Sequence, residues 1–451
     1  MTANPPPLAL PADPLEDIAT PFEGDLLNRA ALALRLTNYV DRLRCGAVLA
    51  IDAQWGEGKS WFARHWAALL RQDGHRVGFV DAFQQDYVED PFLLLAAEIR
   101  RLCAGNASVR KRFVDKAAGV GSALLPVATK AAINLAGKLA GTTDLTDEFA
   151  EAIKTGSKTG GDAAQAWVKR KLEDHAKEQG SVKAFREELI RFAGASDKPV
   201  VVFVDELDRC RPAFAVRLVE RIKHFFDVPN LVFVLVMNRE QLEKAIKGVY
   251  GAETDAATYL GKFLHLSLRL PKNASRQVSY EEQHPTKLFV DAVLRRYGLP
   301  GGAISGFAHA FAVCAVIYGL SLRDIERGCA LYVLAERNWP GLLAYLIALK
   351  LRRPVWFAGV RDRDFGVHEE AKTRLSDEIR RLTLSGESDE WLQAYLNTLI
   401  ALHELAINGE SQAVRQMLQE NWDYLYANGP HPPSTAAFSR AVMRLDLDVE
   451  A

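Results

Sequence analysis

Two long runs of apolar residues indicate β-strands that are buried on both faces. Residues 200–204 and 231–237 consist almost entirely of Val, Leu and Phe, without the alternation of a half-solvated strand. A shorter apolar run at residues 48–51 predicts a further strand. Continuous apolar strands are typical of a parallel sheet covered by helices. The pattern therefore predicts an α/β fold.

From about residue 273 onward the pattern becomes helical. Apolar residues recur there at spacings of three and four. The clearest segments are residues 285–297, 305–317, 322–337, 342–351 and 389–408. Proline, glycine and charged residues interrupt the pattern between residues 354 and 364. We expect one helical region at residues 273–352 and a small helical C-terminal domain at residues 353–451.

The turn after the first strand has the residues of a phosphate-binding loop. Gly56 and Gly58 precede Lys59 and Ser60, and a helix-like stretch follows at once. In such a loop, backbone N–H groups point at a bound anion. Lys59 would reach the β- and γ-phosphates, and the Ser60 hydroxyl would contact Mg²⁺. Ala53 stands where the pattern has a glycine. The alternative to a phosphate-binding loop is an ordinary turn before a helix, in which Lys59 and Ser60 are exposed to solvent.

The long apolar strands end in polar residues that complement this loop. Asp205 and Glu206 follow the first of them, and Asn238 follows the second. Ligands of open α/β sheets bind at the carboxyl ends of the strands. Asp205 would hold Mg²⁺ together with Ser60, and Glu206 would orient and polarise the attacking water. Asn238 would contact the γ-phosphate or that water, cap the following helix, or do both.

The loop and the acidic strand are separated by an unusually long stretch of chain. Ser60 and Asp205 lie 145 residues apart, so we expect a helical insertion at about residues 104–180. Its middle, residues 117–141, is rich in Ala and Gly. Lys130, Asn134 and Lys138 would form one polar stripe on a helix, which opposes a membrane span. The preferred interpretation is a helix packed on a neighbour, and interfacial membrane contact is the second.

Composition restricts the remaining classes of protein. The chain has 451 residues and a net charge of −1, which gives no global sign of nucleic-acid binding. Its five cysteines are scattered without metal-site spacing, so reduced thiols and a cytoplasmic location fit best. Residues 1–19 lack the pattern of a signal peptide and are expected to form a flexible arm.

Several segments together resemble the KAP family of P-loop NTPases, which is related to AAA+ and STAND ATPases. The segments that carry the resemblance are residues 25–29, 54–60, 80–83, 205–212, 238–241, 259–262, 270–271 and 321–327. The string Asp-Glu-Leu-Asp-Arg-Cys with a following proline, at residues 205–212, is the most specific of them. Ala53 and Asp81 depart from the family pattern, because a glycine and an asparagine are usual there. The resemblance covers about residues 20–335.

The resemblance implies a P-loop NTPase core at residues 20–272 that contains the insertion, with residues 273–352 as a helical lid. It implies ATP and Mg²⁺ as ligands. The implied catalytic residues are Lys59, Glu206, Asn238 and Arg323, with Arg327 as the second choice for the sensor arginine. The residues expected to bind the nucleotide are Gln54, Trp55, Gly56, Glu57, Gly58, Lys59, Ser60 and Trp61, and those expected to hold the metal are Ser60 and Asp205. Arg209, Arg211 and Arg217 are candidates for an arginine supplied to a neighbouring subunit.

The function that this implies is an ATP-hydrolysing molecular switch that forms homo-oligomers and acts through partner proteins. Bacterial relatives of the family are associated with defence against phage, so a role in defence is one hypothesis. Two alternatives are a nucleotide-binding scaffold with little turnover and a nucleic-acid-stimulated ATPase. A guanine nucleotide is disfavoured, because the chain has no Asn-Lys-x-Asp motif.

Overall fold

The computed structural model describes most of the chain. The described residues are 18–88, 90–103, 107–124, 180–271, 284–299, 301–335, 339–385, 390–409, 411–421 and 437–446. The expectations for residues 1–17, for the polar stripe at Lys130, Asn134 and Lys138, and for most of the insertion lie outside the described residues.

Five parallel strands form the central sheet. They are β1 (Ala47–Asp52), β2 (Val77–Asp81), β3 (Val200–Asp205), β4 (Leu231–Met237) and β5 (Leu266–Arg269). The apolar runs predicted three of them, β1, β3 and β4. Their order in the sheet is β2-β3-β4-β1-β5, and each neighbouring pair is parallel. The strand that carries the phosphate loop and the strand that carries the acidic residues are thus separated only by β4. Their carboxyl ends lie at the same edge of the sheet, where the predicted site residues gather.

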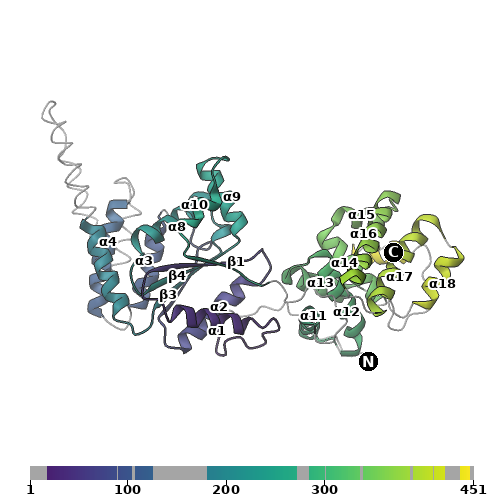
Figure 1. Ribbon diagram of the computed structural model, residues 1–451, viewed down its shortest axis with the longest axis horizontal. Helices are drawn as coiled ribbons and strands as arrows, with labels where there is room; N and C mark the ends of the chain where they lie inside the picture. Colours follow the sequence, from purple (N-terminus) through teal and green to yellow (C-terminus); the bar gives the residue numbers. More distant parts are fainter. Residues whose placement is uncertain are drawn as a thin grey trace, which may run out of the picture.

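Alternate residues of the strands feed two hydrophobic cores, one on each face of the sheet. On β3, Val201 and Phe203 pack into the core below α1 (Arg29–Val40) and α2 (Lys59–Gln72). Val200, Val202 and Val204 pack into the opposite core. That core contains residues of α3 (Pro91–Leu102), α4 (Ala107–Leu124), α8 (Pro212–Phe225), α9 (Arg239–Tyr250) and α10 (Ala256–Gly261). Figure 1 shows α1 and α2 on one side of the sheet and α8 and α9 on the other. Burial on both faces explains why these strands are apolar throughout.

The remaining helices form a second lobe, seen on the right of Figure 1. They are α11 (Pro285–Arg296), α12 (Gly301–Tyr318), α13 (Leu322–Leu334), α14 (Pro340–Arg352), α15 (Pro354–Arg361), α16 (Phe365–Ser385), α17 (Glu390–Asn408), α18 (Gln412–Glu420) and α19 (Ala437–Leu445). Buried residues from α11 to α19 form a single hydrophobic cluster. The predicted boundary at residues 352 and 353 falls within this cluster, and the division into a lid and a C-terminal domain stays a prediction.

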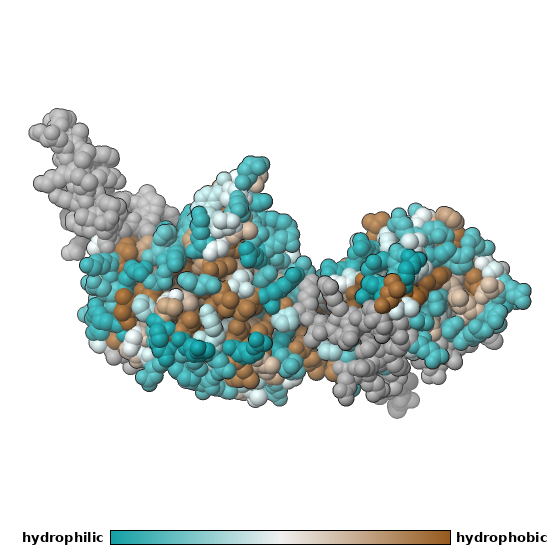
Figure 2. Space-filling model, in the orientation of Figure 1, coloured by the Kyte–Doolittle hydropathy of each residue, from teal (hydrophilic) through white to brown (hydrophobic). Residues whose placement is uncertain are grey.

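The surface of the described residues is mixed in polarity. Figure 2 shows hydrophobic side chains over the middle of the sheet lobe, with hydrophilic ones around them. None of the helices in the described part of the chain has both the length and the apolarity that a bilayer span requires.

The helical lobe contains a close contact between helices at Gly328, which gives a first prediction. A Cβ atom at Gly328 of α13 would lie 2.1 Å from Cζ of Phe311 and 3.0 Å from Cγ2 of Ile347. We expect Gly328→Ala to lower the free energy of unfolding by about 1–3 kcal/mol, because a well-packed core must shift to admit the methyl group. Gly248 in α9 is the control, since no atom lies within 4 Å of its Cβ position. Gly248→Ala should stabilise the protein by about 0.5–1 kcal/mol, and equal effects in thermal unfolding would contradict the packing argument.

Candidate nucleotide site

The phosphate loop is shaped by two glycines in the left-handed region of backbone conformation. Gly56 has a φ of 82° and Gly58 a φ of 75°, which side chains other than glycine rarely adopt. Ala53 is not in that region, and its N–H donates to the carbonyl of Met237 at 3.1 Å. The alanine at this position therefore meets no conformational penalty. The departure from the loop pattern leaves the turn intact.

The helical lobe contacts the loop directly. The N–H of Arg323 donates to the carbonyl of Gly56 at 3.2 Å. A Cβ atom on Gly56 would lie only 2.6 Å from Oγ of Ser321. Ser321 caps α13 by exchanging hydrogen bonds with Asp324, which fixes the first turn of that helix against the loop. Gly56 is thus required both for its backbone conformation and for the approach of α13.

Lys59 forms a buried ion pair that the sequence did not indicate. Its Nζ lies 3.6 Å from Oδ2 of Asp208, and both side chains are almost fully buried. The same carboxylate oxygen accepts a hydrogen bond from the indole N–H of Trp55. The other oxygen of Asp208 is buried and has no hydrogen-bond partner among the described residues. Asp208 therefore fixes the loop lysine through the turn that follows the acidic strand.

The two residues expected to hold the metal lie together. The Ser60 side chain hydrogen-bonds with the carboxylate of Asp205, which also accepts from the Glu206 N–H at 2.8 Å. Burial raises the pKa of Asp205, while the bonds from Ser60 and Glu206 and the charge of Lys59 oppose that shift. Hydroxyl and carboxylate oxygens are ligands that Mg²⁺ prefers. The proximity of Ser60 and Asp205 fits the predicted metal site. Among the described residues, no group of three or more His, Cys, Asp or Glu side chains could hold a metal ion.

The raised pKa of Asp205 makes its charge costly for folding, which gives a second prediction. Because the pKa in the folded state exceeds that in the unfolded state, ionised Asp205 destabilises the fold at neutral pH. In EDTA at pH 7, Asp205→Asn should therefore raise the midpoint of thermal unfolding. The gain should shrink as the pH falls through the pKa of Asp205 in the folded state, and it should vanish below the pKa in the unfolded state, where wild-type Asp205 is neutral in both states. A midpoint at pH 7 that is unchanged or lower in the variant would show that burial does not dominate.

Glu206 is held in a strained conformation beside its own counter-ion. It has a φ of 58°, which is unusual for a residue with a side chain. Its Oε2 accepts from Nη1 of Arg209 at 2.8 Å. Burial raises the pKa of Glu206, Arg209 opposes that shift, and the nearby Asp205 and Asp81 add to it. A strained, partly buried carboxyl with a raised pKa is typical of a functional acid or base.

Asn238 follows β4, and the N–H at the start of the next helix donates to Asp52 and not to Asn238. It lies at the N-cap of α9, but its side chain makes no capping hydrogen bond. Oδ1 of Asp52, at the end of β1, instead accepts from the Arg239 N–H at 2.9 Å. Asn238 is 6% exposed and sits at the same sheet edge as Asp205. The capping role is therefore not seen, and the expected role of Asn238 at the nucleotide stays a prediction.

A cleft of about 510 Å³ opens in front of the loop. Its wall combines the loop and the start of α2 with residues of α11 and α13 and with residues 23–29. Of the residues expected at the nucleotide, those that line it are Gly56, Gly58, Lys59, Ser60, Trp61 and Arg323. Those that do not line it are Gln54, Trp55, Glu57, Asp205, Glu206 and Asn238.

Arg29 joins the upstream segment to the loop. Its guanidinium donates to the carbonyl of Glu57 at 2.7 Å and to that of Gly58 at 3.1 Å. Asp25 caps the start of the same helix by accepting from the Ala30 N–H at 2.7 Å. Burial lowers the pKa of Arg29 to about 10, although Asp25 and Glu57 oppose the shift. The resemblance at residues 25–29 located this segment, but nothing in the sequence identified Arg29 as the residue that braces the loop.

The candidate arginines differ in their positions relative to the cleft. Arg323 and Arg209 line the cleft, whereas Arg327, Arg211 and Arg217 do not. Arg209 is engaged with Glu206, and Arg211 lies 3.5 Å from Asp86. Of the two arginines expected to act as the sensor, Arg323 therefore lies at the cleft and Arg327 does not, and the sensor role stays a prediction.

No curated protein matched the chain. Two solved structures of the Aeropyrum pernix ORC2 protein are similar to it over 97% of this chain and 98% of theirs. The structure with ADPNP and ADP has 9% identity and a TM-score of 0.30, and the ADP form has 11% and 0.32. These values are too low to support an argument about function.

A family model gives the decisive match. The model of the KAP family P-loop domain matches residues 29–287, which is more than half of the chain. The matched range contains the glycine loop, the acidic strand β3 and the polar end of β4. The chain therefore belongs to the KAP family of P-loop NTPases.

Proposed function

We propose that this protein is a Mg²⁺-dependent ATPase that works as a molecular switch. The observation that carries the proposal is the meeting of Lys59 and Ser60 with Asp205 and Glu206 at one edge of the sheet, under a lid that contacts the loop. This is the combination that phosphoryl transfer to water requires: a cradle for phosphates, a metal site and a residue that orients water.

Each residue has a defined task in this proposal. The loop N–H groups and Lys59 bind and orient the β- and γ-phosphates. Ser60 and Asp205 would hold Mg²⁺, which supplies charge neutralisation at those phosphates when bound. Glu206 orients the attacking water, and Asn238 and Arg323 complete the contacts to the γ-phosphate. The aromatic side chain of Trp61, which packs against Phe22 and His65, borders the cleft near Arg29.

The ion pairs of the turn at residues 206–209 suggest how the switch is held. Arg209 holds Glu206, and Asp208 holds Lys59. Both residues must exchange partners before Lys59 can bind a phosphate and Glu206 can orient water. Nucleotide binding would drive that exchange, because a phosphate competes with Asp208 for the lysine. The direct contact between Gly56 and Arg323 would pass the change to the lid.

We further propose that the ATP-bound form assembles into homo-oligomers and acts on partner proteins. Arg211 has a side chain that is 62% exposed and lies beside the acidic strand, which suits a contact with a neighbouring subunit. A role in defence against phage is the biological setting suggested by relatives of the family. Cytoplasmic location fits the scattered cysteines.

The proposal is tested with the purified full-length protein. Phosphate release from ATP is measured with Mg²⁺ and with EDTA, and particle mass is recorded in the same samples. We expect turnover only with Mg²⁺ and a larger particle with ATP than with ADP. Tight ATP binding without turnover would favour the scaffold, and the absence of ATP binding would refute the proposal.

A further inference from the structure

A second group of cavities lies at the β2 edge of the sheet, away from the nucleotide cleft. One cavity of about 410 Å³ lies between β2, α3 and α4, and one of about 180 Å³ lies between α2 and β2. They share Phe79 and Arg101 and therefore adjoin each other. We call the pair the arginine groove.

The arginine groove is strongly basic. It is lined by five arginines, which are Arg64, Arg71, Arg100, Arg101 and Arg110. Glu98 is the one carboxylate among the described residues that line it. The chain as a whole has a net charge of −1, so this excess of positive charge is a local property.

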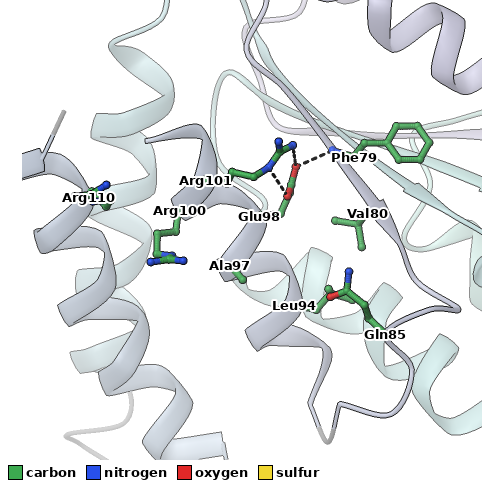
Figure 3. A pocket seen from close by; sticks show the side chains of 9 residues that line it. All are labelled: Phe79, Val80, Gln85, Leu94, Ala97, Glu98, Arg100, Arg101 and Arg110. Atoms are coloured by element: carbon green, nitrogen blue, oxygen red, sulfur yellow. Dashed lines mark hydrogen bonds and ion pairs between the residues drawn. The ribbon is translucent and has the colours of Figure 1, made fainter. Parts of the chain in front are cut away.

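Glu98 is already saturated by its neighbours. It accepts two hydrogen bonds from Arg101, at 2.6 and 3.0 Å, and one from the Phe79 N–H at 2.8 Å. Figure 3 shows this arrangement, with Arg100 and Arg101 on α3, Arg110 on α4 and Phe79 on β2. Glu98 thus covers the edge of β2 and balances Arg101, and the described residues that line the groove include no second carboxylate for Arg64, Arg71 or Arg110.

The smaller cavity brings like charges together. Arg64 lies over the ring of Phe79, with its guanidinium carbon 4.5 Å from the ring centroid. Burial and the charges of Arg101 and Arg64 lower the pKa of Arg71, and only Glu98 opposes them. Guanidinium groups gathered in this way repel one another unless an anion lies between them. The cavity has room for a phosphate group, because it exceeds several times the roughly 30 Å³ that one water occupies.

We propose that the arginine groove binds the phosphate groups of a polyanionic ligand. Guanidinium groups match phosphate oxygens in geometry and charge and remain protonated at all physiological pH values. Two adjoining cavities suit a ligand that carries more than one phosphate, such as a nucleic-acid strand or a linear oligophosphate. This site is separate from the nucleotide cleft and goes beyond the proposed ATPase activity.

The groove also has a physical connection to the nucleotide site. Phe79 stacks on Phe203 of β3, with ring centroids 5.7 Å apart and an angle of 15°. Arg64 belongs to the helix that starts with Lys59 and Ser60, and its charge acts on Asp205. A phosphate bound between Arg64 and Arg71 would therefore lie close to the strand and the helix that carry the metal site.

The test measures binding of a fluorescein-labelled 20-nucleotide thymidine strand by anisotropy, as a function of salt. The full-length Lys59→Ala variant is the background, so that the phosphate loop does not contribute. Arg71→Gln and Arg110→Gln together remove one arginine from each cavity. We expect about 10–30-fold weaker binding near 100 mM salt and a salt slope reduced by about 1.4, the value for two phosphate contacts to a single strand. A parallel series uses inorganic tripolyphosphate as the competitor or, by calorimetry, as the direct ligand.

A matched control removes two exposed cations elsewhere. Lys244→Gln on α9 and Arg380→Gln on α16 change the net charge equally, and their side chains are 60% and 74% exposed. If the groove variant weakens the binding of a probe and the control variant does not, the proposal is supported. The probe that is affected then identifies the ligand as a nucleic-acid strand or as a small oligophosphate. Equal loss in both variants, or no binding of either probe, would overturn it. ATP turnover does not enter this comparison, so its outcome is independent of the proposed ATPase.

Discussion

Replacing Glu206 with glutamine is expected to abolish ATP turnover while ATP binding persists. Glutamine keeps the size of the side chain but loses the negative charge that orients and polarises water. General base catalysis contributes about 10²–10⁴-fold to the rate of such reactions, so turnover should fall by that factor. ATP binding should persist, because the proposed partner of Glu206 is the attacking water and not the nucleotide. Phosphate release and equilibrium binding of a fluorescent ATP analogue measure the two quantities separately.

The matched control is Glu240→Gln, an exposed glutamate of α9 that pairs only with Lys244 among the described residues. Its turnover should equal that of the wild type. A wild-type rate in Glu206→Gln would show that another group orients water. Asp81, whose charge acts on Glu206, would then be the first residue to replace.

Replacing Lys59 with alanine is expected to weaken ATP binding by roughly 10–100-fold. This is the loss expected for a charge-assisted hydrogen bond of about 1.5–3 kcal/mol. The same substitution leaves the buried Asp208 without its cation, so the free energy of unfolding should fall as well. Nucleotide titration and denaturant unfolding of the same sample measure both effects.

A double variant separates the two effects of Lys59. Adding Asp208→Asn to Lys59→Ala removes the unpaired charge and keeps the side chain that accepts from Trp55. Stability should recover, whereas ATP binding should not. Recovery of binding in the double variant would mean that Lys59 acts only by neutralising Asp208, and it would contradict a direct contact with the phosphates.

Local sequence patterns predicted the parallel sheet and the glycine loop, because both depend on short segments of the sequence. The continuous apolar runs at β3 and β4 and the glycines at positions 56 and 58 are recognisable without any partner. Five helices of the second lobe, α11, α12, α13, α14 and α17, follow from the spacing of apolar residues, and all of these except α12 start within two residues of the predicted positions. Helix α15 lies at residues 354–361, where proline, glycine and charged residues interrupt that pattern. The expectation of an α/β fold with a parallel sheet was correct.

The pairings that tune the site could not be predicted, because they join residues far apart in the sequence. Nothing near Asp208 indicates that it meets Lys59, which lies 149 positions upstream. Arg29 reaches the loop only because α1 packs beside α2. The arginine groove was equally hidden, since its five arginines come from three helices and its excess charge disappears in the near-neutral total.

The single core of the helical lobe has a mechanical consequence. The first turn of α13 touches the phosphate loop, and α13 shares that core with every helix up to α19. A close-packed interior does not deform gradually, so we expect the lobe to rotate as one rigid body if the first turn of α13 moves. In such a lever, with its pivot at the loop, α18 sweeps a wider arc than α13. A spectroscopic label at an exposed position of α18, such as Met417, would therefore report hydrolysis more sensitively than one placed beside the nucleotide.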